Sequence, residues 1–151
     1  MINKKQLRLL LTVLLIVGIS VNSIGQAANA EPWTENQLMP PAELAKVIND
    51  KNAPQPIVFS IGPDAIIKNS IDIGPAHEKE YFSKFREALS KLPKDANIVI
   101  YCGCCPFEHC PNIRPAFQLL NEMKFTNQKL LSLQTNIKVD WINKGYPASE
   151  K

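Results

Sequence analysis

The stretch 98–116 limits what this chain can fold into more than any other. It reads IVIYCGCCPFEHCPNIRPA and holds all four cysteines of the chain. Its first residues form an apolar, mostly β-branched run, which is typical of a parallel strand buried on both faces. Asn112 then stands where a helix N-cap is expected, and Pro115 falls in the first turn, where proline is tolerated. The stretch therefore predicts a buried strand, a loop that carries the cysteines, and a helix.

Cys102 is the candidate reactive residue because it follows the strand and faces the start of the next helix. Unpaired backbone N–H groups and the helix dipole favour negative charge there, which stabilises a thiolate. In open parallel sheets, ligands also bind beyond the carboxyl ends of the strands. Both arguments indicate that chemistry takes place at Cys102.

The rest of the chain alternates helical patterns with apolar strands. This alternation predicts an α/β fold with a mainly parallel sheet and right-handed crossovers. The segment 31–39 is expected to be irregular, with Trp33 as a packing anchor. The remaining helices are expected at 41–50, 78–92 and 137–144, and the remaining strands at 57–61, 71–73 and 129–133.

Residues 1–30 have the features of a cleaved export signal. A basic start precedes an apolar core at 9–19, and Ala28-Asn29-Ala30 forms a small-x-small cleavage site. The apolar core is short for a permanent membrane-spanning helix. We therefore expect an exported protein, periplasmic or secreted, whose single mature domain covers 31–151.

Cleavage at this site gives a direct prediction about the N-terminus of the purified protein. Sequencing of that N-terminus should begin at Glu31, because Ala30 is the last residue of the cleavage motif. Recovery of Met1 from the membrane fraction would contradict cleavage and export.

Cleavage would also change the charge balance. The full chain carries 17 basic and 14 acidic residues, and the signal holds Lys4, Lys5 and Arg8, so the mature chain would carry 14 of each. A neutral chain has no basic excess with which to attract nucleic acid or anionic lipid. We therefore expect neither nucleic acid nor, after cleavage, a membrane as a partner, and we predict no oligomeric state.

Several short motifs resemble those of single-domain rhodanese-like proteins. Tyr101-Cys102 follows a buried strand, and Trp141 precedes Gly145-Tyr146-Pro147 near the end of the chain. The segment 71–76, IDIGPA, falls where that family has a His-Ile-Pro-Gly-Ala-like turn. The resemblance covers about 41–147. It implies a sheet of about five strands with helices on both faces, and sulfurtransferase activity.

For the site, the resemblance implies that Cys102 carries sulfane sulfur as a persulfide. The sulfur would come from a small sulfur donor or a protein thiol and pass to a nucleophile. Backbone N–H groups at Gly103, Cys104 and Cys105 would hold the anionic sulfur and the substrate. Apart from the resemblance, Lys68 and Arg114 are the candidate cations for an anionic substrate, and Arg114 is the better placed because it lies in the first turn of the helix. This chemistry requires no cofactor.

The loop departs from that family in its length and in its three further cysteines. Arg114 lies twelve positions after Cys102. A disulfide from Cys104 or Cys105 to Cys110 would pin such a loop, and an exported setting permits it. We expect one such bond in the resting protein, whereas pairing of the adjacent Cys104 and Cys105 is disfavoured by disulfide geometry.

Two other interpretations of the cysteines remain open. The run Tyr101-Cys102-Gly103-Cys104-Cys105 superficially matches a thioredoxin-like redox motif, although little chain follows it. A dithiol–disulfide redox partner is therefore one alternative. A thiol metal binder is the other, because four thiols, with His109, are sufficient ligands for zinc or a soft copper ion. Adjacent cysteines are not expected to point into one tetrahedral site, so no metal is predicted.

Overall fold

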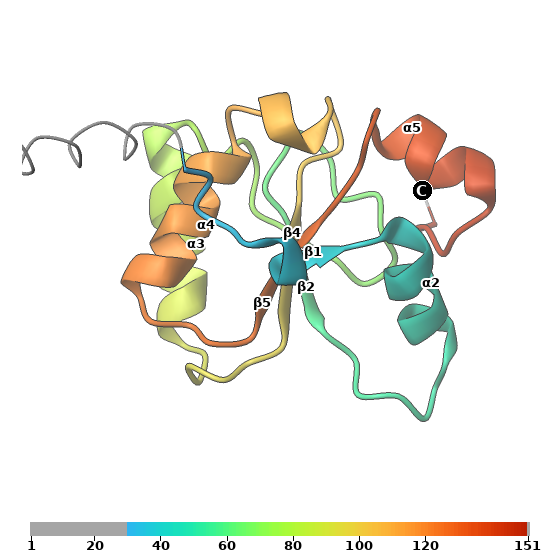
Figure 1. Cartoon of the computed structure of the whole chain (residues 1–151), viewed down its shortest axis with the longest axis horizontal. Coiled ribbons are helices and arrows are strands. Elements are labelled where there is room, and N and C mark those ends of the chain that lie inside the picture. The colour runs from blue at the N-terminus through green and yellow to red at the C-terminus, as the bar shows by residue number, and fades with distance from the viewer. Residues whose placement is uncertain (1–29, 151) are drawn as a thin grey trace, which may run out of the picture. The chain divides into compact units, whose positions relative to one another are not determined.

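Five parallel strands form one sheet in this protein, for which a computed structural model describes residues 30–150 (Figure 1). The strands are β1 (Leu38–Met39), β2 (Ile57–Ser60), β3 (Ile71–Asp72), β4 (Ile98–Tyr101) and β5 (Gln128–Leu131). Their order is β1-β5-β4-β2-β3, which puts β4 in the middle of the sheet. Every pairing is parallel, so the predicted α/β fold is confirmed, and it is consistent with a rhodanese-like sheet.

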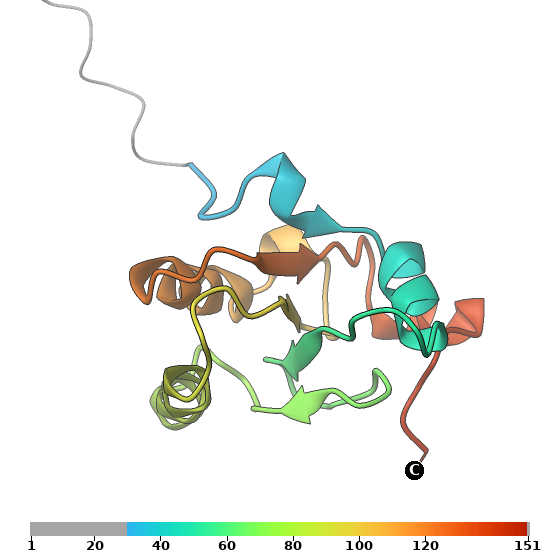
Figure 2. The ribbon, with the colours of Figure 1, turned by 90° about the horizontal axis from the view of Figure 1, so that it is seen from below.

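Helices cover both faces of the sheet (Figure 2). The helices are α2 (Pro41–Asn49), α3 (Lys79–Ser90), α4 (Ile113–Glu122) and α5 (Ile137–Asp140). Side chains of α3 and α4 share one core with Ile98 and Ile100 of β4. Side chains of α2 share the other core with Val99 and Tyr101. Because successive side chains of a strand point to opposite faces, burial on both sides explains the continuous apolar run of β4.

At the carboxyl-terminal end of β4, neighbouring residues are buried in the two cores on opposite faces of the sheet. Tyr101 and Cys102 are each at most 1% exposed, and they belong to opposite cores. The Tyr101 hydroxyl accepts hydrogen bonds from the backbone N–H groups of Ile66 and Ile67, at 2.9 and 3.2 Å. These bonds fix the loop after β2 beside the point where Cys102 leaves the strand.

Two segments differ from the sequence prediction. The segment 31–39, predicted to be irregular, contains the edge strand β1. This strand is too short for its side-chain alternation to show in the sequence. The last helix ends at Asp140, and a 3₁₀ turn at Ile142–Lys144 follows it. Gly145 closes this turn in the left-handed conformation, with φ of 68°, which glycine adopts without a steric penalty.

The start of the compact unit is Glu31, the first residue after the predicted signal. Trp33 packs as predicted, with its ring centroid 5.9 Å from that of Phe117 and 6.1 Å from that of Phe107. The export signal predicted for 1–30 lies outside the described residues, apart from Ala30. Within the described range, no helix combines the length and the apolar character needed to cross a membrane.

Candidate functional site

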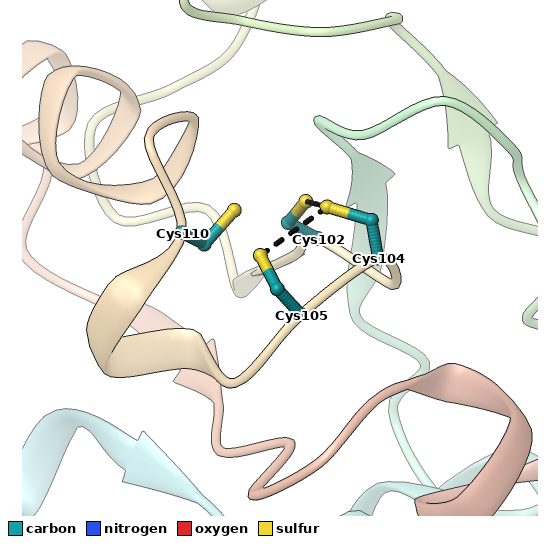
Figure 3. A group of neighbouring side chains, drawn as sticks. All are labelled: Cys102, Cys104, Cys105 and Cys110. Atoms are coloured by element: carbon teal, nitrogen blue, oxygen red, sulfur yellow. Dashed lines mark hydrogen bonds between the residues drawn. The ribbon is translucent and has the colours of Figure 1, made fainter.

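The four cysteines come together at the carboxyl end of β4 (Figure 3). All four Sγ atoms lie within 4.8 Å of one another. The Sγ of Cys104 is 3.2 Å from that of Cys102 and 3.3 Å from that of Cys105. The expectation that Cys104 and Cys105 would not point into one site is wrong, because the chain bends at both residues and turns both thiols inward.

The cluster is buried on one side and open on the other. Cys102 and Cys110 are 1% and 0% exposed, Cys105 is half-buried, and Cys104 is exposed. Cys110 reaches the cluster because the 3₁₀ turn η2 (Phe107–His109) folds the loop back towards β4. All four cysteines are free thiols in this structure, and the disulfide from Cys104 or Cys105 to Cys110 stays a prediction.

Asn112 connects this cluster to the turn that precedes α3. It is 3% exposed, and its Nδ2 donates a hydrogen bond to Cys102 Sγ at 3.4 Å. Its Oδ1 accepts from the backbone N–H of His77 at 3.0 Å and lies 2.6 Å from Nδ1 of the same residue. Because two nitrogens of His77 face Oδ1, the amide nitrogen is oriented towards the sulfur.

The sequence prediction for Asn112 was right about its position and wrong about its side chain. The residue directly precedes α4, but its side chain makes no capping hydrogen bond. The side-chain oxygen bonds His77 from another part of the chain instead. A capping asparagine and a site asparagine have the same sequence pattern, so only the tertiary contact distinguishes them.

These contacts lower the pKa of the Cys102 thiol to about 5. The largest cause is the Cys110 thiol, which faces the Cys102 sulfur. The backbone N–H of Cys104 and the Asn112 side chain lower the pKa further, whereas burial opposes them. A thiolate that accepts several hydrogen bonds is stabilised relative to its protonated form, and Cys102 is therefore the group that ionises first.

The thiols of Cys104 and Cys110 shift in the opposite direction, towards the protonated form. Burial, with the contact to Cys102 second, raises the pKa of Cys104 to about 12. The pKa of Cys110 is also raised, chiefly by its contact with Cys102 and then by burial. The cluster thus favours ionisation of Cys102 and opposes ionisation of Cys104 and Cys110.

Two glycines let the backbone close around Cys102. A Cβ atom on Gly62, which follows β2, would lie 2.9 Å from Cys102 Sγ and 3.4 Å from the backbone nitrogen of Gly103. In the sequence, Gly62 directly follows the predicted strand at 57–61, and no local pattern indicates its contact with Cys102. A Cβ atom on Gly103 would lie 2.9 Å from Cβ of Ile137 in α5, whose N–H donates to the Gly103 carbonyl. Gly103, predicted to bind substrate, is therefore also a packing residue.

Arg114 lies in a different environment from the thiols. Its guanidinium forms an ion pair with Glu31 and lies 5.6 Å from the centroid of the Trp33 ring. The hollow at this place is also lined by Glu35 and Glu108, and none of the cysteines lines it. Within residues 30–150, Arg114 is paired with a carboxylate, so its binding of an anionic substrate stays a prediction.

The comparisons with known proteins add no family to these observations. No family model matches the chain, and no curated protein matches its sequence. The sequence and structure together establish an α/β protein with a five-stranded parallel sheet and a cluster of four cysteines beyond its central strand.

Proposed function

We propose that this protein is an exported, rhodanese-like sulfurtransferase that carries sulfane sulfur as a persulfide on Cys102. The observation that supports this most is the position of one ionisable thiol. Cys102 follows the central strand, and its Sγ accepts hydrogen bonds from the side chain of Asn112 and the backbone N–H of Cys104. Ligand sites in open parallel sheets are found at this edge.

The proposed transfer has two steps, and both conserve electrons without a cofactor. The Cys102 thiolate attacks the outer sulfur of a donor such as thiosulfate. A new S–S bond forms on Cys102, and the donor's S–S bond breaks, so that sulfite leaves with the bonding pair. An acceptor thiolate then attacks the outer sulfur of the persulfide, and Cys102 leaves as a thiolate.

The surroundings of Cys102 support this chemistry because they stabilise the same charge at the start and end of the cycle. The thiolate is the nucleophile in the first step and the leaving group in the second. The low pKa of Cys102 therefore provides a ready nucleophile at neutral pH and a good leaving group afterwards. The contact between Asn112 and His77 holds the amide donor in place through the cycle.

Mass spectrometry of the intact protein tests the proposal. The reduced, chelator-treated protein should gain the mass of one sulfur atom after incubation with thiosulfate, and a reductant should remove it. The control is the same protein incubated with sulfite, which has no sulfane sulfur. An unchanged mass with thiosulfate would refute sulfur transfer from that donor class.

The same spectrum distinguishes a second candidate function, a dithiol–disulfide redox partner. This function is favoured by one observation, the 3.2 Å separation between Cys102 Sγ and the Sγ of the exposed Cys104. A redox protein would lose the mass of two hydrogen atoms on mild oxidation and would not gain sulfur. If the protein loses two hydrogen atoms on oxidation but gains no sulfur from thiosulfate, the redox function replaces the sulfurtransferase proposal.

A further inference from the structure

We infer that the four cysteines bind one zinc(II) ion as a four-thiolate site. This inference goes beyond sulfur transfer and does not depend on it. It rests on the convergence of four sulfur atoms, on their chemical uniformity and on the donors around them.

The spacing of the sulfur atoms fits a tetrahedral ion. With zinc–sulfur bonds of about 2.3 Å, the sulfurs of such a site lie about 3.8 Å apart. The observed separations range from 3.2 Å, between Cys102 and Cys104, to no more than 4.8 Å for any pair. The required separation falls inside this range, so small side-chain movements would be enough to place all four sulfurs around one ion.

The composition of the cluster selects the kind of ion. Within the described part of the chain, the group that converges contains only cysteine sulfur, without carboxylate or imidazole. Soft thiolate ligands favour zinc and copper(I) and disfavour magnesium and calcium. Four ligands complete the tetrahedral shell that zinc adopts in closed sites, whereas copper(I) has no comparable need for a fourth thiolate.

Hydrogen-bond donors around the sulfurs match a metal–thiolate centre. The Asn112 side chain donates to Cys102 Sγ, which also accepts from the backbone N–H of Cys104. Cys110 accepts from the backbone N–H of Asn112. Donors of this kind orient ligands and stabilise the negative charge that remains on thiolates bound to zinc. The exposed Cys104 leaves one side of the cluster accessible to an incoming ion.

In the reduced protein, binding would be a ligand exchange without any change of oxidation state, and it would exclude the predicted disulfide because that bond consumes two of the four thiols. Each cysteine that is still protonated releases its proton to solvent, and the ion loses its water ligands. Cys102 would then be a zinc ligand, so a zinc-loaded protein would lack the free thiolate that sulfur transfer needs.

Titration of the reduced, metal-free protein with cobalt(II) chloride tests the inference. We expect intense tetrahedral d–d bands and sulfur-to-cobalt charge-transfer bands that reach a plateau at one equivalent, and displacement of cobalt by one equivalent of zinc chloride. An octahedral cobalt spectrum, or binding of copper(I) without zinc, would overturn the assignment of zinc.

Variants locate the ion. Cys104→Ser and Cys105→Ser should each weaken cobalt binding and lower the sulfur-to-cobalt absorbance, because one thiolate ligand is lost, whereas His109→Ala, an exposed change in the same loop, should keep the full spectrum. Cys104 is exposed, so its substitution leaves the core intact, and near-ultraviolet circular dichroism verifies the fold of each variant. Loss of the spectrum in His109→Ala, or retention of the full spectrum in both serine variants, would contradict the four-cysteine site. Sulfur loading is measured with chelator, so the two proposals fail independently.

Discussion

Replacement of Cys102 by serine is expected to abolish sulfur loading from thiosulfate while leaving the fold intact. A serine hydroxyl is nearly isosteric with the thiol, but it does not ionise in the range where the Cys102 thiolate forms. The Asn112 amide can still donate to the new oxygen, so the buried hydroxyl keeps a partner. A satisfied hydrogen bond of this kind contributes about 1 kcal/mol, which limits any loss of stability.

The measurement is the intact mass after thiosulfate treatment, with thermal unfolding recorded for the same sample. His109→Ala serves as the control, because it changes an exposed side chain of the same loop. It should load sulfur as the unmodified protein does. If Cys102→Ser still gains a sulfur atom, the nucleophile is another cysteine, and Cys110 becomes the candidate.

The second large effect is expected for Asn112→Asp, which places a carboxylate beside the Cys102 sulfur. A like charge disfavours the thiolate, so the pKa of Cys102 should rise from its value of about 5 into or above the ordinary cysteine range. The ultraviolet absorbance of the thiolate, followed as a function of pH in the reduced, metal-free protein, measures this directly. Sulfur loading near neutral pH should fall with the thiolate fraction.

In the unmodified protein, the lowered pKa of Cys102 determines how stability changes with pH. The Cys102 thiolate is present above about pH 5 and is lost as the pH falls through that value. Its contribution to stability is complete above the pKa of a cysteine in the unfolded chain, about 8.5, and declines as the pH falls to the folded value. Asn112→Asp should remove most of this dependence.

Asn52→Asp is the matched control, since it makes the same chemical change on an exposed loop between α2 and β2. Its thiolate titration should overlay that of the unmodified protein. His77→Ala keeps the backbone N–H that bonds Asn112 and removes only the ring. It should therefore raise the pKa of Cys102 by less than Asn112→Asp does. If Cys102 of the unmodified protein titrates with the pKa of an ordinary cysteine, the loop does not stabilise its thiolate and the proposal is contradicted.

The centre of the sheet could be predicted from the sequence because β2 and β4 are largely buried on both faces. β4 is a continuous apolar run in which every residue is buried, so its pattern depends little on details of packing. β1 could not be predicted in this way. It consists of Leu38 and Met39, and its existence depends on pairing with Leu130 and Leu131, more than ninety residues later in the chain.

For the candidate site, the sequence indicates the position of Cys102 but not the residues that contact it. Cys102 could be located because its place after a strand is a local property of the sequence. The contacts of Asn112 with His77 and of Gly62 with Cys102 join segments that are distant in the chain, and no local pattern indicates them. The convergence of Cys104 and Cys105 depended on bends that residue types alone do not specify.

The membership of Cys102 and Cys110 in the hydrophobic core has a consequence for what the cluster accepts. The backbone at Gly62 approaches Cys102 Sγ so closely that even an added methyl group there would collide with the sulfur. A bulky adduct on Cys102, such as glutathione or a long alkyl group, would have to displace packed side chains and disrupt the core. A single sulfur atom or a bare metal ion would displace far less of the packed core. The packing around Cys102 therefore favours small adducts on its sulfur over bulky ones.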